Sequence, residues 1–153
     1  MRAGDVVEDF ELPDETGVTR RLSTLLEDGP VVLFFYPAAM TYGCTKESCH
    51  FRDLNDEIAR AGGQPVGISG DPVEKQKRFA DLHTFGFPLL SDVDGAVATT
   101  FGVRRRVAAL KNRRTTFVID TDRRILATLH SEFSMSAHAD KALDVLRARA
   151  STG

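Results

Sequence analysis

The amino-acid sequence predicts one α/β domain in which a mixed β-sheet is covered by helices on both faces. Two short apolar runs, residues 31–36 (VVLFFY) and 65–69 (PVGIS), are typical of strands buried on both faces. A segment with helical character follows each run, and two apolar stretches near the C-terminus flank a polar turn, as in a β-hairpin. Strands that alternate with helices, followed by a hairpin and a last helix, indicate a mixed sheet with helices on each side.

Capping residues and glycines set the expected helix boundaries. From about residue 43 to residue 61 the apolar positions recur at helical spacing, and Gly62-Gly63 ends the helix. Asp71, Pro72 and Glu74 predict the N-cap, first and third positions of a helix that runs to about residue 83. Further elements are expected at residues 87–90 (strand), 94–101 (short helix closed by Gly102), 115–119 with 125–130 (hairpin) and 137–150 (helix capped by Ser136, with Ala139, Leu143 and Leu146 facing inward).

The size and charge of the chain limit the kinds of function to consider. A chain of 153 residues has the length of one domain and buries roughly 70% of its unfolded surface, so we expect residues 1–153 to form one domain with loose termini. The formal net charge of −2 gives no overall attraction to nucleic acid or to membranes. The basic segment 104–114 contains no aromatic residue or recognition motif, and we interpret it as a solvated loop.

The N-terminal sequence and the two cysteines suggest a cellular setting. The first residues contain acidic side chains and no apolar run long enough for a signal peptide or a membrane span, so we expect a cytoplasmic protein. Thiols are normally kept reduced in the cytoplasm. Cys44 and Cys49 are therefore interpreted as redox-active rather than as a structural disulfide.

Cys44 stands where a buried strand gives way to the start of a helix. A thiol reacts as its thiolate, and at an ordinary pKa of about 8.5 only about 3% is ionised at pH 7. The helix N-terminus stabilises an anion by about 0.3–1 kcal/mol, which lowers the pKa by less than about one unit, so a cation must supply the rest. Arg114 is the best candidate, because it directly precedes a predicted strand that would hold its guanidinium in place.

Three further residues near Cys44 have a chemical and an ordinary interpretation. In the chemical interpretation, the Thr41 hydroxyl orients a substrate at the thiolate, Pro37 shields the thiolate from water, and Glu47 holds the arginine. The ordinary interpretations are a helix cap for Thr41, a strand stop for Pro37 and a first-turn dipole partner for Glu47. Spacing alone favours the ordinary interpretations of these three residues.

Several motifs together resemble one enzyme family. Pro37-x3-Thr41-x2-Cys44 resembles the peroxiredoxin signature, and Gly43-Cys44-Thr45-x-Glu47 followed by Cys49 is similar to the PrxQ, or bacterioferritin-comigratory-protein, subfamily. The segments 9–17, 87–92 and 114–120 resemble further parts of that family, so the resemblance spans nearly the whole chain. One position departs from the pattern, because Tyr42 stands where the subfamily usually has proline.

The resemblance implies a fold, an activity and a set of site residues. The fold is a thioredoxin-like domain, and the activity is reduction of hydrogen peroxide or organic hydroperoxides. Cys44 would be the peroxidatic cysteine and Cys49 the resolving cysteine, with Thr41 and Arg114 binding the peroxide. Pro37, Gly43 and Glu47 would complete the substrate pocket. The resemblance further implies thioredoxin or a similar dithiol as reductant and no metal or organic cofactor. From the charge and composition we expect no nucleic-acid or membrane partner, and a monomer and a weak dimer both stay open.

The residues themselves leave other interpretations of Cys49 open. At about 100° per residue, Cys49 lies roughly 140° from Cys44 around the helix, whereas Phe51 and Ile58 lie close to the Cys44 face. We therefore expect Cys49 to point away from the core, although a buried structural thiol is the common alternative. The neighbouring His50 is a candidate for assisting proton transfer or an incidental surface residue, and His83, His130 and His138 are expected on surfaces or at helix ends.

Three other functional classes compete with a peroxidase. A zinc site built from Cys44, Cys49 and His50 lacks the paired short cysteine spacings that structural zinc prefers. A thioredoxin-like disulfide oxidoreductase normally uses C-x-x-C, whereas four residues separate the cysteines of this chain. A non-enzymatic redox sensor would also be oxidised at Cys44, but it would consume one peroxide per chain instead of turning over.

Overall fold

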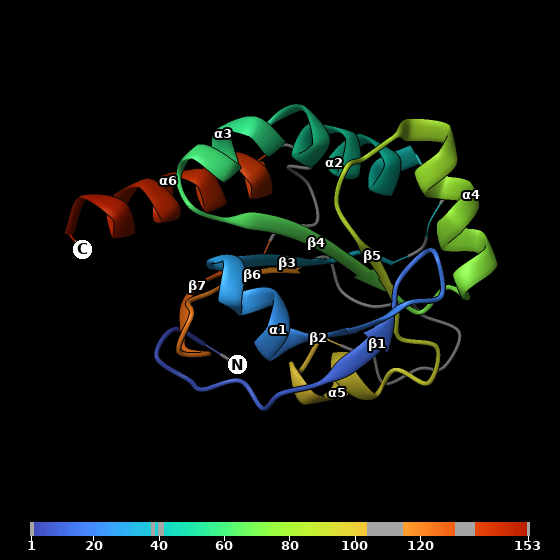
Figure 1. The fold of residues 1–153 in the computed structure, drawn as a ribbon, viewed down its shortest axis with the longest axis horizontal. Coiled ribbons are helices and arrows are strands. Elements are labelled where there is room, and N and C mark those ends of the chain that lie inside the picture. Colours follow the sequence, from blue (N-terminus) through green and yellow to red (C-terminus); the bar gives the residue numbers. More distant parts are fainter. Residues whose placement is uncertain (1, 38, 40–41, 104–114, 131–136, 153) are drawn as a thin grey trace.

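Five strands form the central sheet, in the order β5-β4-β3-β6-β7 (Figure 1). The computed structural model describes residues 2–37, 39, 42–103, 115–130 and 137–152. The strands of the sheet are β3 (Val31–Phe35), β4 (Gln64–Ser69), β5 (Leu89–Ser91), β6 (Thr115–Ile119) and β7 (Ile125–His130). The helices are α1 (Leu22–Leu25), the 3₁₀ turn η1 (Leu26–Asp28), α2 (Tyr42–Asp53), α3 (Asn55–Arg60), α4 (Val73–His83), α5 (Ala96–Thr100) and α6 (Ala137–Thr152).

The sheet is mixed, as the sequence predicts. Strand β3 pairs in parallel with β4 and antiparallel with β6, and β5 extends the parallel side. Strands β6 and β7 form the predicted antiparallel hairpin around Asp120-Thr121-Asp122. The central position of β3 agrees with its wholly apolar sequence, since a strand with neighbours on both sides and helices on both faces exposes nothing to water.

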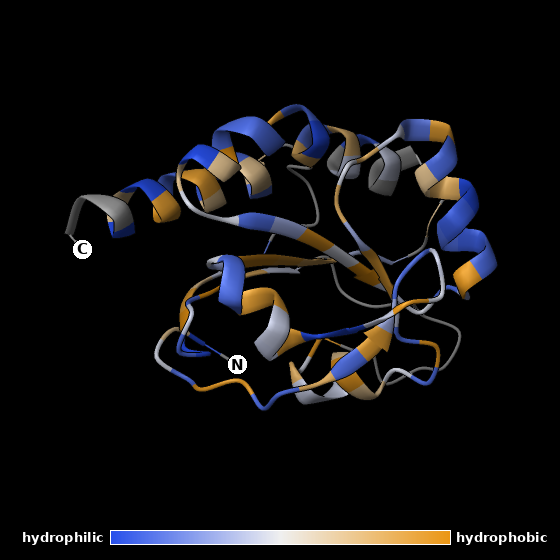
Figure 2. Ribbon diagram, in the orientation of Figure 1, coloured by the Kyte–Doolittle hydropathy of each residue, from blue (hydrophilic) through white to orange (hydrophobic). Residues whose placement is uncertain are grey.

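Two hydrophobic cores lie on opposite faces of the sheet. Val32 and Phe34 of β3 belong to the core beneath α2, α3, α4 and α6, while Leu33 and Phe35 belong to the core that α1 and α5 cover. Figure 1 shows these two helix layers above and below the sheet, and Figure 2 shows hydrophobic residues along the central strands with polar residues on the outer helices. The prediction of helices on both faces is confirmed. In α6, the predicted inward positions Ala139, Leu143 and Leu146 are all buried.

Two local features differ from the sequence-based expectations. The single helix expected over residues 43–61 is divided at Leu54 (φ −94°, ψ 2°) into α2 and α3, although backbone bonds from Leu54 to His50 and from Ile58 to Leu54 cross the break. A separate antiparallel hairpin of β1 (Glu11–Pro13) and β2 (Thr19–Arg21) was not predicted, because its strands are too short for a clear alternation. The basic segment 104–114 and the predicted cap Ser136 lie outside the described residues.

No helix in the described part of the chain is long and apolar enough to cross a membrane.

Candidate active site

The segment from β3 to α2 carries the candidate nucleophile. Buried Tyr36 and half-buried Pro37 follow the strand β3, and the backbone of Cys44 lies in the first turn of α2. The prediction that Cys44 stands at a helix start behind a buried strand is confirmed. At this position the backbone N–H groups of the first turn have no partner within the helix, so they favour an anion.

Other predicted site residues are only partly described. Gly43, Cys44 and Glu47 lie in α2. At these positions the structure describes the backbone but not the side chains of Cys44 and Glu47. Thr41 and Arg114 lie outside the described residues, so their predicted roles in peroxide binding stay predictions.

A buried carboxylate holds the segment between β3 and α2. Asp71 Oδ2 accepts the backbone N–H of Ala39 (2.6 Å) and the hydroxyl of Ser69 (2.6 Å), and Lys75 Nζ lies 3.2 Å from Oδ1. The predicted N-cap role of Asp71 is wrong: α4 begins at Val73, Pro72 is its N-cap residue, and no side chain caps this end. The physical reason is competition, since the carboxylate accepts a backbone N–H 32 residues earlier in the chain instead of the backbone N–H groups at the start of α4.

Gln76 extends this contact into a buried hydrogen-bond network. Its amide nitrogen donates to the hydroxyl of Ser69 (3.0 Å) and to the carbonyl of Leu90 (2.8 Å), while its amide oxygen accepts the hydroxyl of Tyr36. Gln76 is fully buried, and its polar groups are therefore all the more costly to leave unpaired. The network joins the end of β3, the loop after it, β4, β5 and α4. The chain segment that leads from β3 to Cys44 therefore starts from a fixed framework.

Sequence reasoning missed this network, although a signal for it exists. Gln76 stands one turn before Phe79 on the buried face of α4, where a polar residue is unexpected. A polar residue on an apolar helix face indicates a buried hydrogen-bond partner, but only the fold identifies that partner.

Cys49 lies at the edge of the core, half-buried and with a free thiol. Burial raises the pKa of the Cys49 thiol, and Asp53 adds to this effect, whereas nearby Arg52 opposes it. The expectation that Cys49 points away from the core is only partly met. Phe51, by contrast, is fully buried, as expected, and stacks on Phe34 with ring centroids 4.2 Å apart.

The histidines near the site differ in their contacts. His83 Nδ1 lies 3.7 Å from Cys49 Sγ, whereas His50 Nε2 lies 3.1 Å from Asp140 of α6. The histidine in contact with Cys49 is thus His83, at the end of α4, and not the adjacent His50. His138, the second residue of α6, lies at a helix end, one of the two positions expected for it, and it is buried beside Thr116 with Oγ1 and Nδ1 2.6 Å apart.

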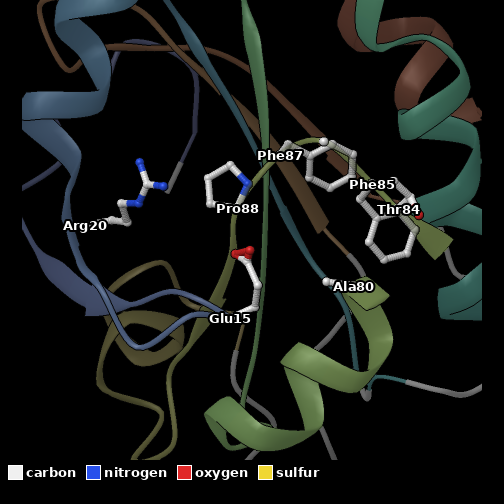
Figure 3. A pocket seen from close by; sticks show the side chains of 8 residues that line it. Glu15, Arg20, Ala80, Thr84, Phe85, Phe87 and Pro88 are labelled. Carbon is white, nitrogen blue, oxygen red and sulfur yellow. The ribbon is translucent and has the colours of Figure 1, made fainter. Parts of the chain in front are cut away.

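A separate pocket opens between the N-terminal hairpin and the end of α4 (Figure 3). Glu15 and Arg20 lie on the hairpin side, and Phe85 and Phe87 contribute aromatic rings. Both charged groups already have partners within the protein: Glu15 accepts the backbone N–H of Leu89 (3.2 Å), and Arg20 pairs with Asp14 (2.8 Å). None of the residues that line this pocket belongs to the segment of residues 37–49.

Comparison with known proteins gives a consistent result. A sequence profile described as the AhpC/TSA family matches residues 3–128. A relative from Mycobacterium tuberculosis, named as a peroxiredoxin, is 63% identical over 150 residues, which cover 97% of both chains. Peroxiredoxin Bcp of Escherichia coli is 38% identical over 155 residues, which cover 98% of both chains. The crystal structure of peroxidoxin BcpB from Mycobacterium tuberculosis matches with a TM-score of 0.93 at 64% identity, covering 97% of both chains.

The Asp71 network predicts a measurable loss of stability. Asp71→Ala leaves the buried N–H of Ala39 and hydroxyl of Ser69 without their acceptor, so we expect the free energy of unfolding to fall by about 1–3 kcal/mol. Urea unfolding of the variant and of the parent chain measures this difference in the free energy of unfolding. The matched control is Asp81→Ala, which removes an exposed carboxylate paired with Lys77 and should cost less than about 0.5 kcal/mol. Equal losses in the two variants would contradict the role given to Asp71.

The burial of Cys49 predicts a shift in its pH dependence. In Cys44→Ser, Cys49 is the remaining thiol, and its rate of alkylation by iodoacetamide reports the thiolate fraction. Because burial raises the thiol pKa, the midpoint of the rate against pH should be higher in the folded chain than in the same variant unfolded in urea. Restricted access slows alkylation at every pH without moving the midpoint, so coincident midpoints would rule out the shift. Mass spectrometry of the alkylated chain gives both curves.

Proposed function

This chain belongs to the AhpC/TSA family, which makes it a peroxidase of the peroxiredoxin type, and we propose that Cys44 attacks the peroxide and Cys49 resolves the product. The predicted resemblance to PrxQ/BCP peroxiredoxins and the predicted thioredoxin-like fold are confirmed by the relatives and by the structural match. The observation that carries the proposal is the position of Cys44 in the first turn of α2, behind a buried strand.

The proposed reaction needs only thiol chemistry. The Cys44 thiolate attacks one oxygen of hydrogen peroxide or an organic hydroperoxide, the O–O bond breaks, and water or an alcohol leaves, so that Cys44 becomes a sulfenic acid. The Cys49 thiol then displaces the sulfenic hydroxyl as water and forms a disulfide. Thioredoxin or a similar dithiol reduces that disulfide and is itself oxidised. A cytoplasmic location suits such a reductant.

The pairing of β3 with β6 supports Arg114 as the activating cation. Thr115, the residue after Arg114, pairs with Phe35 near the end of β3, two residues before Pro37. The chain therefore enters β6 at Thr115 at the same end of the sheet where it leaves β3 toward Pro37. We propose that the guanidinium of Arg114 and the hydroxyl of Thr41 bind the peroxide there, with Pro37, Gly43 and Glu47 completing the pocket.

Helix geometry requires α2 to open before the disulfide forms. Five residues along a helix give a rise of ~7.5 Å, which with a rotation of roughly 140° places the two Cα atoms about 8–9 Å apart. Disulfides rarely span more than about 7 Å between Cα atoms, so residues 43–50 must lose helical structure first. The buried Phe51, stacked on Phe34, supports an end to this unwinding just after His50.

Cysteine variants test the assigned roles. Cys44→Ser should abolish peroxide-dependent consumption of NADPH in an assay with thioredoxin and its reductase. Cys49→Ser should react with one equivalent of peroxide and accumulate the Cys44 sulfenic acid, detected by trapping and mass spectrometry. Full thioredoxin-linked turnover of Cys49→Ser would exclude its resolving role, and a single peroxide consumed per intact chain would indicate a sensor instead of an enzyme.

Hydrogen exchange tests the opening of α2. Amides in peptides covering residues 42–54 should exchange much faster in the disulfide form than in the reduced form, because an unwound helix no longer protects them. The buried strand β3 serves as an internal control and should stay protected in both forms. Equal protection of α2 in both forms, with the Cys44–Cys49 disulfide confirmed by mass, would contradict the unwinding step while leaving the peroxidase assignment intact.

A further inference from the structure

Two residues of α2 contact the same residue of α4. Cys49 Sγ lies 3.7 Å from the His83 ring nitrogen Nδ1, and Arg52 Nη1 donates to the His83 carbonyl oxygen at 2.8 Å. Cys49 and Arg52 are three residues apart and therefore share one face of α2. His83, the last residue of α4, thus contacts both the candidate resolving thiol of Cys49 and Arg52 in the next turn of α2.

The His83 ring is held by α4 and its neighbours, independently of α2. It meets Phe79, one turn earlier, edge-on at a centroid distance of 5.5 Å, and it stacks on Phe85 at 5.5 Å. Both phenyl rings are buried, and Thr84, in the left-handed region at φ 50°, turns the chain out of the helix. If the first turns of α2 unwind, the His83 ring stays in place and Cys49 moves away from it.

Unwinding of the first turns of α2 would therefore break one contact to His83 and keep the other. Cys49 precedes the buried Phe51 and lies in the part of α2 that must open, whereas Arg52 follows Phe51 and lies in the part that stays. The contact between Cys49 and His83 exists in the closed form and must break before Cys49 can reach Cys44. An interaction made in the closed form alone raises the free energy of opening by its own value.

We propose that His83 is a positioning residue that holds Cys49 against α4 in the reduced enzyme and so slows the resolving step until α2 opens. This inference rests on the proposed two-cysteine mechanism. The Nδ1 atom holds the Cys49 thiol, whereas the packing of the His83 ring on Phe79 and Phe85 does not. The expected consequence is that loss of the nitrogen accelerates disulfide formation, which is the opposite of the effect expected for a catalytic base.

The test uses two variants of His83 that separate the nitrogen from the ring. His83→Phe keeps a flat ring between Phe79 and Phe85 but removes Nδ1, whereas His83→Asn places an amide atom near the position of Nδ1 and removes the ring. Rapid acid quench after one equivalent of hydrogen peroxide, followed by intact mass measurement, separates the sulfenic acid from the disulfide, because condensation releases one water. The control is His130→Phe at the exposed end of β7.

We expect His83→Phe to shorten the lifetime of the sulfenic acid about two- to fivefold, the effect of losing one weak hydrogen bond. His83→Asn should restore a lifetime closer to that of the parent, and His130→Phe should match the parent. In the reduced protein, His83→Phe should also speed hydrogen exchange of residues 42–50.

Each other outcome overturns the inference. A longer lifetime in His83→Phe would make His83 a proton acceptor for Cys49, and an unchanged lifetime would mean that the contact carries no free energy. Equal acceleration in the Phe and Asn variants would assign the effect to general packing. If the parent chain forms no disulfide between Cys44 and Cys49, the proposed function fails together with the inference; if it does form one, the inference alone is at stake.

Discussion

Strand β3 is buried on both faces, and the rest of the fold is placed relative to it. Its side chains alternate between the two cores, so that the helices above and below the sheet pack on the same five residues, Val31–Phe35. A strand in this position cannot shift its register without moving apolar side chains into the wrong core. The chain that leaves β3 at Tyr36 therefore has a fixed origin, and the helix that carries Cys44 begins a few residues later.

The connection from this strand to α2 combines a rigid start with a helix that is less firmly held. Asp71 and Gln76 tie the beginning of the connection to β4 and α4 through buried hydrogen bonds. Phe51 secures the last turn of α2 in the core. Between these two points, Cys49 and His50 are only half-buried, and each makes a polar contact, Cys49 with His83 and His50 with Asp140. Local stability follows the density of buried apolar contacts, so the segment with the cysteines is the one suited to open.

The residues that were predicted correctly have a common property. The strands predicted over residues 31–36 and 65–69, found at 31–35 and 64–69, and the burial of Phe51 and Ile58 follow from apolar runs and apolar periodicity, which the core enforces directly. The position of Cys44 at a helix start follows from the same pattern. An error arose where a polar side chain had a choice of partners: Asp71 bonds to the backbone of Ala39 and does not cap α4.

The sequence by itself determined the order of the strands and helices from β3 onward, the two-sided burial of β3, the position of Cys44 and the membership of the peroxiredoxin family, because each depends on local periodicity or on a short motif. The tertiary structure decided which distant groups meet. Ala39 and Asp71 are 32 residues apart in the chain, and Cys49 and His83 are 34 apart. No local propensity links such pairs, since their contact exists only after α2 and α4 have packed on the same face of the sheet.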